Sequence, residues 1–220
     1  MKITWLSHSC FDLYDGRYHV ITDPFLTGNG LARVRASDVR ADFILVSHCH
    51  GDHIGDAVPI SKRTGAAICG VAELAGMLSK EGIKNVLLGN LGGWVPTSFG
   101  RFKLVPAQHG SGLPGALACG FIVDMGGKKV YFAGDTAFFS DMSLFGDEGL
   151  DCALLPIGDF YTMGPADAVK AAKALRAKTV VPMHFDTFPV IRQNPHDYAA
   201  MCAKEGINVR VMQIGETIEI

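Results

Sequence analysis

The sequence predicts an α/β (α+β) fold of four layers, in which two sheets pack face to face and helices cover their outer sides. Strand and helix patterns alternate in the first half of the chain and again near its end, whereas the stretch 94–132 holds consecutive strand patterns separated by turn residues. A sheet that carries helices on one face must still bury its other face, and a second sheet can cover it.

Apolar and β-branched runs bounded by turn residues predict the individual strands. Outside the antiparallel stretch 94–132, they lie at 3–13, 18–22, 43–46, 66–69, 86–88, 152–157, 179–183 and 209–213. The dipeptide Asp15-Gly16 between the first two runs suits a hairpin turn. Helical spacing occurs at 71–80, 165–175 and 195–204, and prolines begin the last two of these segments.

Length and composition fit one globular domain over residues 1–220. Hydrophobic residues make up 48% and charged residues 19%, and no linker or low-complexity tract divides the chain. The 20 basic and 22 acidic side chains leave no net positive field, and no basic run is present. We therefore expect a small-molecule substrate and no nucleic acid partner, and the sequence leaves open whether the chain forms a homo-oligomer.

The cysteines and the N-terminus favour a cytoplasmic protein. The six cysteines form no CxxC pair and several lie in apolar runs, which is typical of free thiols in a reducing compartment. The chain enters a strand pattern at once, without a charged and apolar leader. No apolar stretch reaches the roughly 18 to 20 residues that span a bilayer, so we expect no membrane partner.

The main chemical signal is a histidine-rich segment directly after the strand pattern at 43–46. It holds three histidines and one aspartate in six residues, in the order His48, His50, Asp52 and His53. The first two are two residues apart in extended chain and point to one side, and Gly51 is expected to let the chain turn back. Imidazole and carboxylate groups are ligands for borderline metals such as zinc, so the segment predicts metal binding.

If the segment serves two metal ions, its four groups cannot complete both coordination shells, so further ligands have to come from elsewhere. His109, Asp135 and His184 each follow a strand pattern, which would bring them to a sheet edge. Taken singly, each of them is ambiguous, since a lone histidine at a strand end more often has a structural role.

The order of these residues resembles the metallo-β-lactamase superfamily, and the resemblance covers the whole chain. It implies a single-domain αββα sandwich and a binuclear metal-dependent hydrolase. It implies one metal held by His48, His50 and His109, and a second held by Asp52, His53 and His184, with Asp135 bridging both. Segments 5–11, 22–25, 157–165 and 182–188 further resemble the metal-dependent hydrolases related to L-ascorbate-6-phosphate lactonase. Asp186 departs from that group, where an amide is expected.

Such a centre predicts hydrolysis of an ester, lactone or phosphoester bond in a small, anionic substrate. Two divalent ions that share a water lower its pKa from about 15.7 towards about 7, which gives a hydroxide nucleophile, and they polarise the substrate oxygen. Zinc suits the three-histidine site best, whereas manganese or iron would also suit the site with a carboxylate.

Outside the ligand set, four residues are candidates for the reaction. Together with the ligand Asp52, His8 and Asp23 are candidate catalytic residues, as proton donor or as orienting groups, although a structural role for His8 is equally open. Asp159 and Thr162 precede a helix and are candidates for binding an anionic group, while Thr162 could instead cap that helix. We assign no site role to His19 or His196 and propose no thiol nucleophile.

Two other functions compete with this interpretation. A nuclease of the same superfamily would need an arm or a basic patch that grips nucleic acid, and the chain has neither an insertion nor a basic run. A non-catalytic metal-binding protein would keep the scaffold without turnover, but such a protein is expected to lose ligands, and this chain has the complete set.

Overall fold

In the computed structural model, which describes residues 1–220, thirteen strands form two sheets. The seven-stranded sheet has the order β13-β1-β2-β3-β4-β5-β6 and the six-stranded sheet has the order β12-β11-β10-β9-β8-β7. The strands of the first sheet are β1 (Lys2–Ser7), β2 (Cys10–Tyr14), β3 (His19–Thr22), β4 (Phe43–Leu45), β5 (Ala67–Val71), β6 (Val86–Gly89) and β13 (Thr217–Glu219). Those of the second are β7 (Trp94–Thr97), β8 (Gly100–Pro106), β9 (Cys119–Met125), β10 (Lys128–Phe132), β11 (Cys152–Pro156) and β12 (Thr179–Met183).

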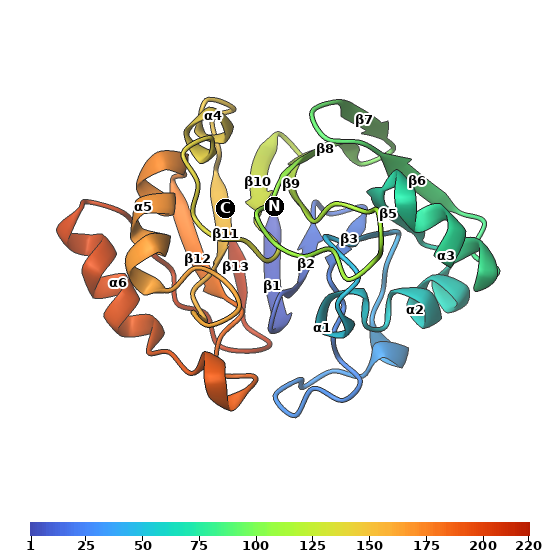
Figure 1. Cartoon of the computed structure of the whole chain (residues 1–220), viewed down its shortest axis with the longest axis horizontal. Helices are drawn as coiled ribbons and strands as arrows, with labels where there is room; N and C mark the ends of the chain where they lie inside the picture. The colour runs from blue at the N-terminus through green and yellow to red at the C-terminus, as the bar shows by residue number, and fades with distance from the viewer.

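Helices cover the outer sides of the two sheets, as the sequence predicts (Figure 1). The α-helices are α1 (Gly51–Ile54), α2 (Ala57–Thr64), α3 (Ala75–Lys80), α4 (Met142–Gly146), α5 (Pro165–Leu175) and α6 (Pro195–Lys204), and 3-10 turns lie at Ala36–Asp38, Ala72–Leu74 and Pro189–Ile191. Figure 1 shows α5 and α6 on one side of the sheets and α2 and α3 on the other. One cluster of 58 buried apolar residues includes strands of both sheets and joins the layers.

The strand directions bring one set of loops to a common edge. Strands β3 to β6 are parallel to one another, and so are β10 to β12. Strand β8 runs in the direction of β10, because both are antiparallel to β9. Parallel strands have their carboxyl ends at the same edge, and that is where open α/β sheets place their binding sites. The loops after β8, β10, β11 and β12 therefore start from one edge of their sheet.

The predicted elements match the structure best where the patterns are long. Helices α5 and α6 and strand β12 have the predicted bounds. The run 3–13 is two strands, since the chain turns at His8. The predicted strand 209–213 is wrong: Val209 forms only an isolated bridge with Val180, and β13 pairs with β1 instead. None of the helices is both long enough and apolar enough to cross a membrane.

The turn at Gly51 differs from the prediction in its mechanism. Gly51 begins the short helix α1, for which His50 is the N-cap residue, and its backbone is not left-handed. The chain turns back because one helical turn follows β4, so the reversal does not depend on the conformational freedom of glycine. Asp52 and His53 lie on this turn.

The two sheets approach each other closely at Gly134, in the loop after β10. Its φ is +57°, and a Cβ placed there would lie 2.7 Å from Ser47 Cβ and 3.0 Å from the carbonyl oxygen of Cys119. The backbone N–H of Cys119 donates to the carbonyl of Ser47 at 3.0 Å at the same point. Only glycine satisfies both the left-handed backbone and the lack of space.

We predict that Gly134→Ala lowers the free energy of unfolding by about 2 kcal/mol more than Gly127→Ala does, measured by urea denaturation. Gly127 is the matched control, because its φ is +73° and its surroundings within 4 Å are open. Both variants carry the backbone penalty, but only Gly134→Ala adds a clash. An equal loss of stability in the two variants would contradict the tight contact.

Candidate metal centre

The structure brings all seven sequence-predicted ligands to the segments that follow the carboxyl ends of β4, β8, β10 and β12. Their positions are His48 and His50 after β4, Asp52 and His53 on α1, His109 after β8, Asp135 after β10 and His184 after β12. His48, His50 and His109 form one group, Asp52, His53 and His184 lie together with His8, and Asp135 contacts nitrogens of both groups. Both sheets contribute to the arrangement.

The first group consists of three histidines whose nitrogens converge. His50 Nδ1 lies 3.0 Å from His48 Nε2 and 3.3 Å from His109 Nε2. Burial lowers the pKa of His48 to about 2 and also lowers the pKa of His109, so both rings are neutral at neutral pH. Neutral imidazole is the form that binds metal, and three such nitrogens suit a zinc ion.

Hydrogen bonds fix the tautomer of His48. Ser47 Oγ donates to Asp23 at 2.5 Å, so its remaining contact, 3.0 Å from His48 Nδ1, requires the ring nitrogen to donate. The proton then lies on Nδ1, and the Nε2 lone pair faces the other two histidines.

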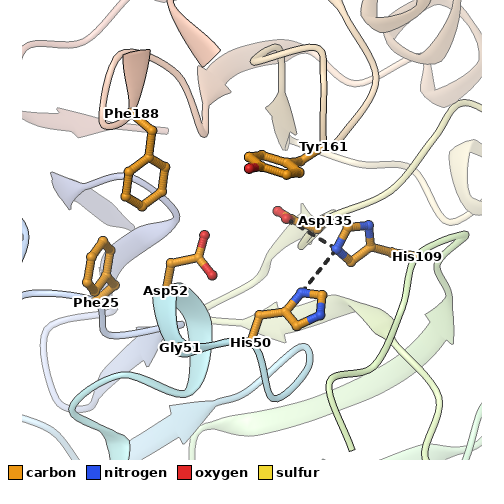
Figure 2. A pocket seen from close by; sticks show the side chains of 8 residues that line it. All are labelled: Phe25, His50, Gly51, Asp52, His109, Asp135, Tyr161 and Phe188. Carbon is orange, nitrogen blue, oxygen red and sulfur yellow. Dashed lines mark hydrogen bonds and ion pairs between the residues drawn. The ribbon is translucent and has the colours of Figure 1, made fainter. Parts of the chain in front are cut away.

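The second group consists of Asp52, His53 and His184. The Nε2 atoms of both histidines lie 3.8 Å from Asp52 Oδ2. Asp135 connects the two groups: its oxygens lie 3.2 Å from His53 Nε2, 3.1 Å from His184 Nε2 and 3.6 Å from His109 Nε2. Figure 2 shows Asp135 beside His109 and across the pocket from Asp52.

No lysine or arginine side chain compensates the carboxylates of this centre. Asp23 and Asp135 are buried, Asp52 is half-buried, and no lysine or arginine pairs with any of them. Burial alone would lower the pKa of His53, but the carboxylates of Asp135 and Asp23 raise it well above its usual value. A proton on His53 is thus the cation available to Asp135 within the protein itself. A divalent ion would displace that proton, because metal ligands have to be deprotonated.

The buried polar atoms also fit a metal. His53 Nε2, Asp135 Oδ1 and His184 Nε2 are all buried, and none of their close contacts has the geometry of a hydrogen bond. Buried polar atoms without a hydrogen bond are rare in folded proteins and usually have an ion, a water or a functional role. These three atoms are ligand atoms of the types that zinc, manganese and iron accept.

Asp23 orients His53 through the ring nitrogen Nδ1, which is not the nitrogen that faces Asp135. Its Oδ2 lies 2.7 Å from His53 Nδ1, and its Oδ1 accepts a hydrogen bond from the backbone N–H of Ser47 at 2.8 Å. If Nδ1 donates to Asp23, the Nε2 of His53 is free to bind a cation. Asp23 is completely buried and does not line the pocket, so it contacts a ligand residue and not the substrate.

His8 lies against the second group. Its Nε2 is 3.3 Å from Asp52 Oδ2, its Nδ1 is 2.9 Å from Thr187 Oγ1, and its ring centroid is 4.1 Å from that of His184. Burial, together with His184, lowers the pKa of His8 to about 4, so the ring is neutral near pH 7. A neutral ring can donate to only one of its two partners.

Three of these residues have strained backbones. His8, Asp23 and His184 have φ of +53°, +29° and +54°. A left-handed conformation costs a non-glycine residue about 1–3 kcal/mol and is maintained only where the surroundings determine it. The surrounding structure thus imposes the positions of these side chains at the ends of their strands.

A pocket of about 750 Å³ opens onto the centre (Figure 2). It is lined by Phe25, His50, Gly51, Asp52, His109, Asp135, Tyr161 and Phe188. Sequence reasoning missed the three aromatic residues. A signal was available for Phe188 alone, an aromatic residue in the loop after β12 that also carries the predicted ligand His184.

Asp159 and Thr162 do not line this pocket, whereas Tyr161 between them does. The Asp159 side chain lies over Gly164, and the Thr162 hydroxyl donates to the Met163 carbonyl. The suggestion that Thr162 caps α5 is wrong, since Gly164 is the N-cap residue and no side chain accepts from the helix. Asp186 is exposed and accepts from the backbone N–H of Gln193, away from the pocket.

Comparison with known proteins identifies the family. The model of the β-lactamase superfamily domain matches residues 18–185. The chain belongs to the β-lactamase superfamily. It is 46% identical to a UPF0173 metal-dependent hydrolase of Thermus thermophilus over 224 residues, covering 100% of this chain and 99% of the relative. A relative of the same name from Listeria innocua is 44% identical over 233 residues and is covered completely, as is this chain.

The solved structure of Igni18, a metallo hydrolase from the archaeon Ignicoccus hospitalis, is also similar. It is 36% identical, with a TM-score of 0.92 over 99% of this chain and 97% of that one. The predicted β-lactamase superfamily fold is therefore confirmed. The closer relationship to L-ascorbate-6-phosphate lactonase stays a prediction.

We predict that Asp23→Asn weakens zinc binding by about 10- to 100-fold, measured by competition with a chromogenic chelator. An amide in place of Oδ2 would put N–H donors opposite Ser47 Oγ, which donates there, and would remove the acceptor that the metal-binding tautomer of His53 requires. Asp12→Asn is the matched control, because Asp12 accepts from His19 in a similar pair remote from the pocket. Unchanged zinc affinity in Asp23→Asn would show that Asp23 does not orient His53.

Proposed function

We propose that this β-lactamase superfamily protein is a hydrolase with two divalent metal ions, zinc first and manganese or iron as alternatives. His48, His50 and His109 would hold one ion, Asp52, His53 and His184 the other, and Asp135 would bridge them. The position of Asp135 within 3.6 Å of nitrogens from both groups is the observation that carries the proposal. The names of the relatives, metal-dependent hydrolases, support it.

When bound, the ions would supply Lewis acidity, which lowers the pKa of a water and polarises the oxygen of an ester, lactone or phosphoester. The chain's own residues would hold this chemistry in place. Asp52 lines the pocket; burial alone would raise its pKa, but the contact with His8 and the charge of His53 hold that pKa well below the usual value, so Asp52 stays a carboxylate that can bind a cation. Asp23 would keep the metal-binding tautomer of His53.

The predicted anionic character of the substrate receives no support from the pocket. None of the lining residues is a lysine or an arginine, and Asp159 and Thr162 lie outside the lining. The bound ions themselves would be the only cations available to a substrate. An ester or a lactone accordingly fits the pocket better than a phosphoester with additional negative charge.

We predict that the protein binds two zinc ions per chain, measured by elemental analysis, and that chelation lowers its melting temperature. Ligand binding to the folded state at about 100 times Kd stabilises it by about 2.7 kcal/mol. In Asp135→Asn both equivalents should be weakened together, whereas His196→Ala, an exposed histidine outside the site, should keep them. Retention of both ions by Asp135→Asn would show that Asp135 does not bridge them.

We predict that zinc-loaded protein hydrolyses at least one of a chromogenic ester, a lactone or a phosphodiester, and that His50→Ala loses this activity. His196→Ala is the control again. Salt-dependent cleavage of RNA with no turnover of the small substrates would favour the nuclease instead. Metal binding without any turnover above the His50→Ala background would favour the non-catalytic protein.

We infer that His8 positions Asp52, and predict that His8→Asn lowers kcat about tenfold, changes KM less, and leaves the metal content intact. Asparagine tolerates the left-handed backbone at this position but is too short to reach Asp52. Thr187→Val removes the second partner of His8 and should lower kcat in the same direction by a smaller factor. A kcat equal to that of the parent protein in both variants would refute this role.

A further inference from the structure

Two aromatic side chains form one wall of the pocket. Phe25, in the loop after β3, and Phe188, in the loop after β12, stack with ring centroids 6.2 Å apart and planes 28° apart. The ring of His8 meets both with its edge, at 5.7 Å from each centroid. Figure 2 shows the pair side by side, next to Asp52. Because the two loops come from different sheets, the fold itself holds this wall in place.

A third aromatic residue lies on the opposite side. Figure 2 shows Tyr161, in the loop after β11, across the pocket from Phe188 and near Asp135. Its hydroxyl points into the space between the Tyr161 and Phe188 rings. Tyr161 is 53% exposed and its neighbour Phe160 is 70% exposed, so neither is needed for the core. A large exposed aromatic residue at a pocket gains its burial only when a ligand covers it.

The polar lining of the pocket offers nothing to a second charged group. His50, Asp52, His109 and Asp135 belong to the proposed ligand set and would be occupied by the ions. The remaining lining residues are Gly51 and the three aromatics, with no lysine or arginine among them. A carboxylate or phosphate away from the scissile bond would meet apolar rings and no positively charged side chain, which is costly.

We propose that the substrate carries an uncharged apolar group, aryl or alkyl, next to its scissile bond, and that this group lies between Phe25 and Phe188 on one side and Tyr161 on the other. The inference rests on the proposed hydrolase function, since it assigns the substrate class of the same site. It places selectivity in the aromatic wall and the chemistry in the histidines and carboxylates.

Three p-nitrophenyl esters with the same leaving group test the proposal on zinc-loaded protein: the acetate, the phenylacetate and the anionic hemisuccinate. After division by the hydroxide-catalysed rate of each ester, kcat/KM for the phenylacetate should exceed that for the acetate by about tenfold or more, as expected for filling an apolar pocket. The hemisuccinate should be the poorest substrate. Equal values for acetate and phenylacetate, or preference for the hemisuccinate, would overturn the proposal.

Variants locate the preference in the wall. Tyr161→Ala, at an exposed loop position, and Phe188→Ala should each reduce the preference for phenylacetate at least about threefold, while Phe188→Leu should keep most of it. Leu144→Ala is the control, because Leu144 is an exposed apolar residue, 63% exposed, on α4 and outside the pocket. A preference that survives Tyr161→Ala and Phe188→Ala unchanged would also overturn the proposal.

Binding separates this proposal from the hydrolase function. Acetohydroxamic, phenylacetohydroxamic and succinic monohydroxamic acids carry the same metal-binding group, and their Kd values on zinc-loaded protein can be measured by calorimetry. Phenylacetohydroxamic acid should bind about tenfold more tightly than acetohydroxamic acid in the parent protein and lose that advantage in Phe188→Ala. This result without ester turnover would sustain the apolar site and refute the hydrolase. Ester turnover with equal Kd values would sustain the hydrolase and refute the apolar site.

Discussion

The buried carboxylate of Asp135 is the interaction on which the site depends. It is 3% exposed, lies against His53, His109 and His184, and has no lysine or arginine partner. Breaking the pairing of a buried charge costs about 3–5 kcal/mol, so a cation has to be present at this position. A proton on His53 can supply one positive charge, and divalent metals supply more. The ligand loops are thus arranged around one charge that the fold buries and then compensates.

The two sheets support this arrangement because they meet at a point where the backbone has little conformational freedom. Gly134 precedes Asp135 and contacts Ser47, which precedes His48 and bonds to Asp23. One contact between the sheets therefore lies directly beside candidate ligands from both sheets, Asp135 and His48. The left-handed backbones at His8 and His184 cost free energy that the apolar core has to offset. A functional site that stores strain needs such a core, and the 58-residue cluster joins both sheets.

Much of the site could be predicted because its signals are local. The segment from His48 to His53 follows a strand, and Asp135 and His184 end strands with clear apolar patterns. The aromatic wall could not be predicted, since Phe25 and Phe188 become neighbours only when two sheets assemble. The place of Asp159 and Thr162 before a helix predicts substrate binding, but the chain at Gly164 enters α5 without a side-chain cap, and Tyr161 reaches the pocket instead. The sequence does not predict strand β13, because its three residues carry almost no pattern.

The separation of the ligand set from the aromatic wall has a consequence for selectivity. The candidate ligand residues are fixed by burial and by each other, so substitutions there would alter the charge balance and the proposed metal binding together. Tyr161 and Phe188 contribute no ligand and are partly exposed, so the fold tolerates changes in them at little cost in stability. Because His8 touches both Asp52 and the two phenylalanines, it connects the aromatic wall with the candidate metal centre. Substrate preference can accordingly change within this fold while the metal chemistry stays constant.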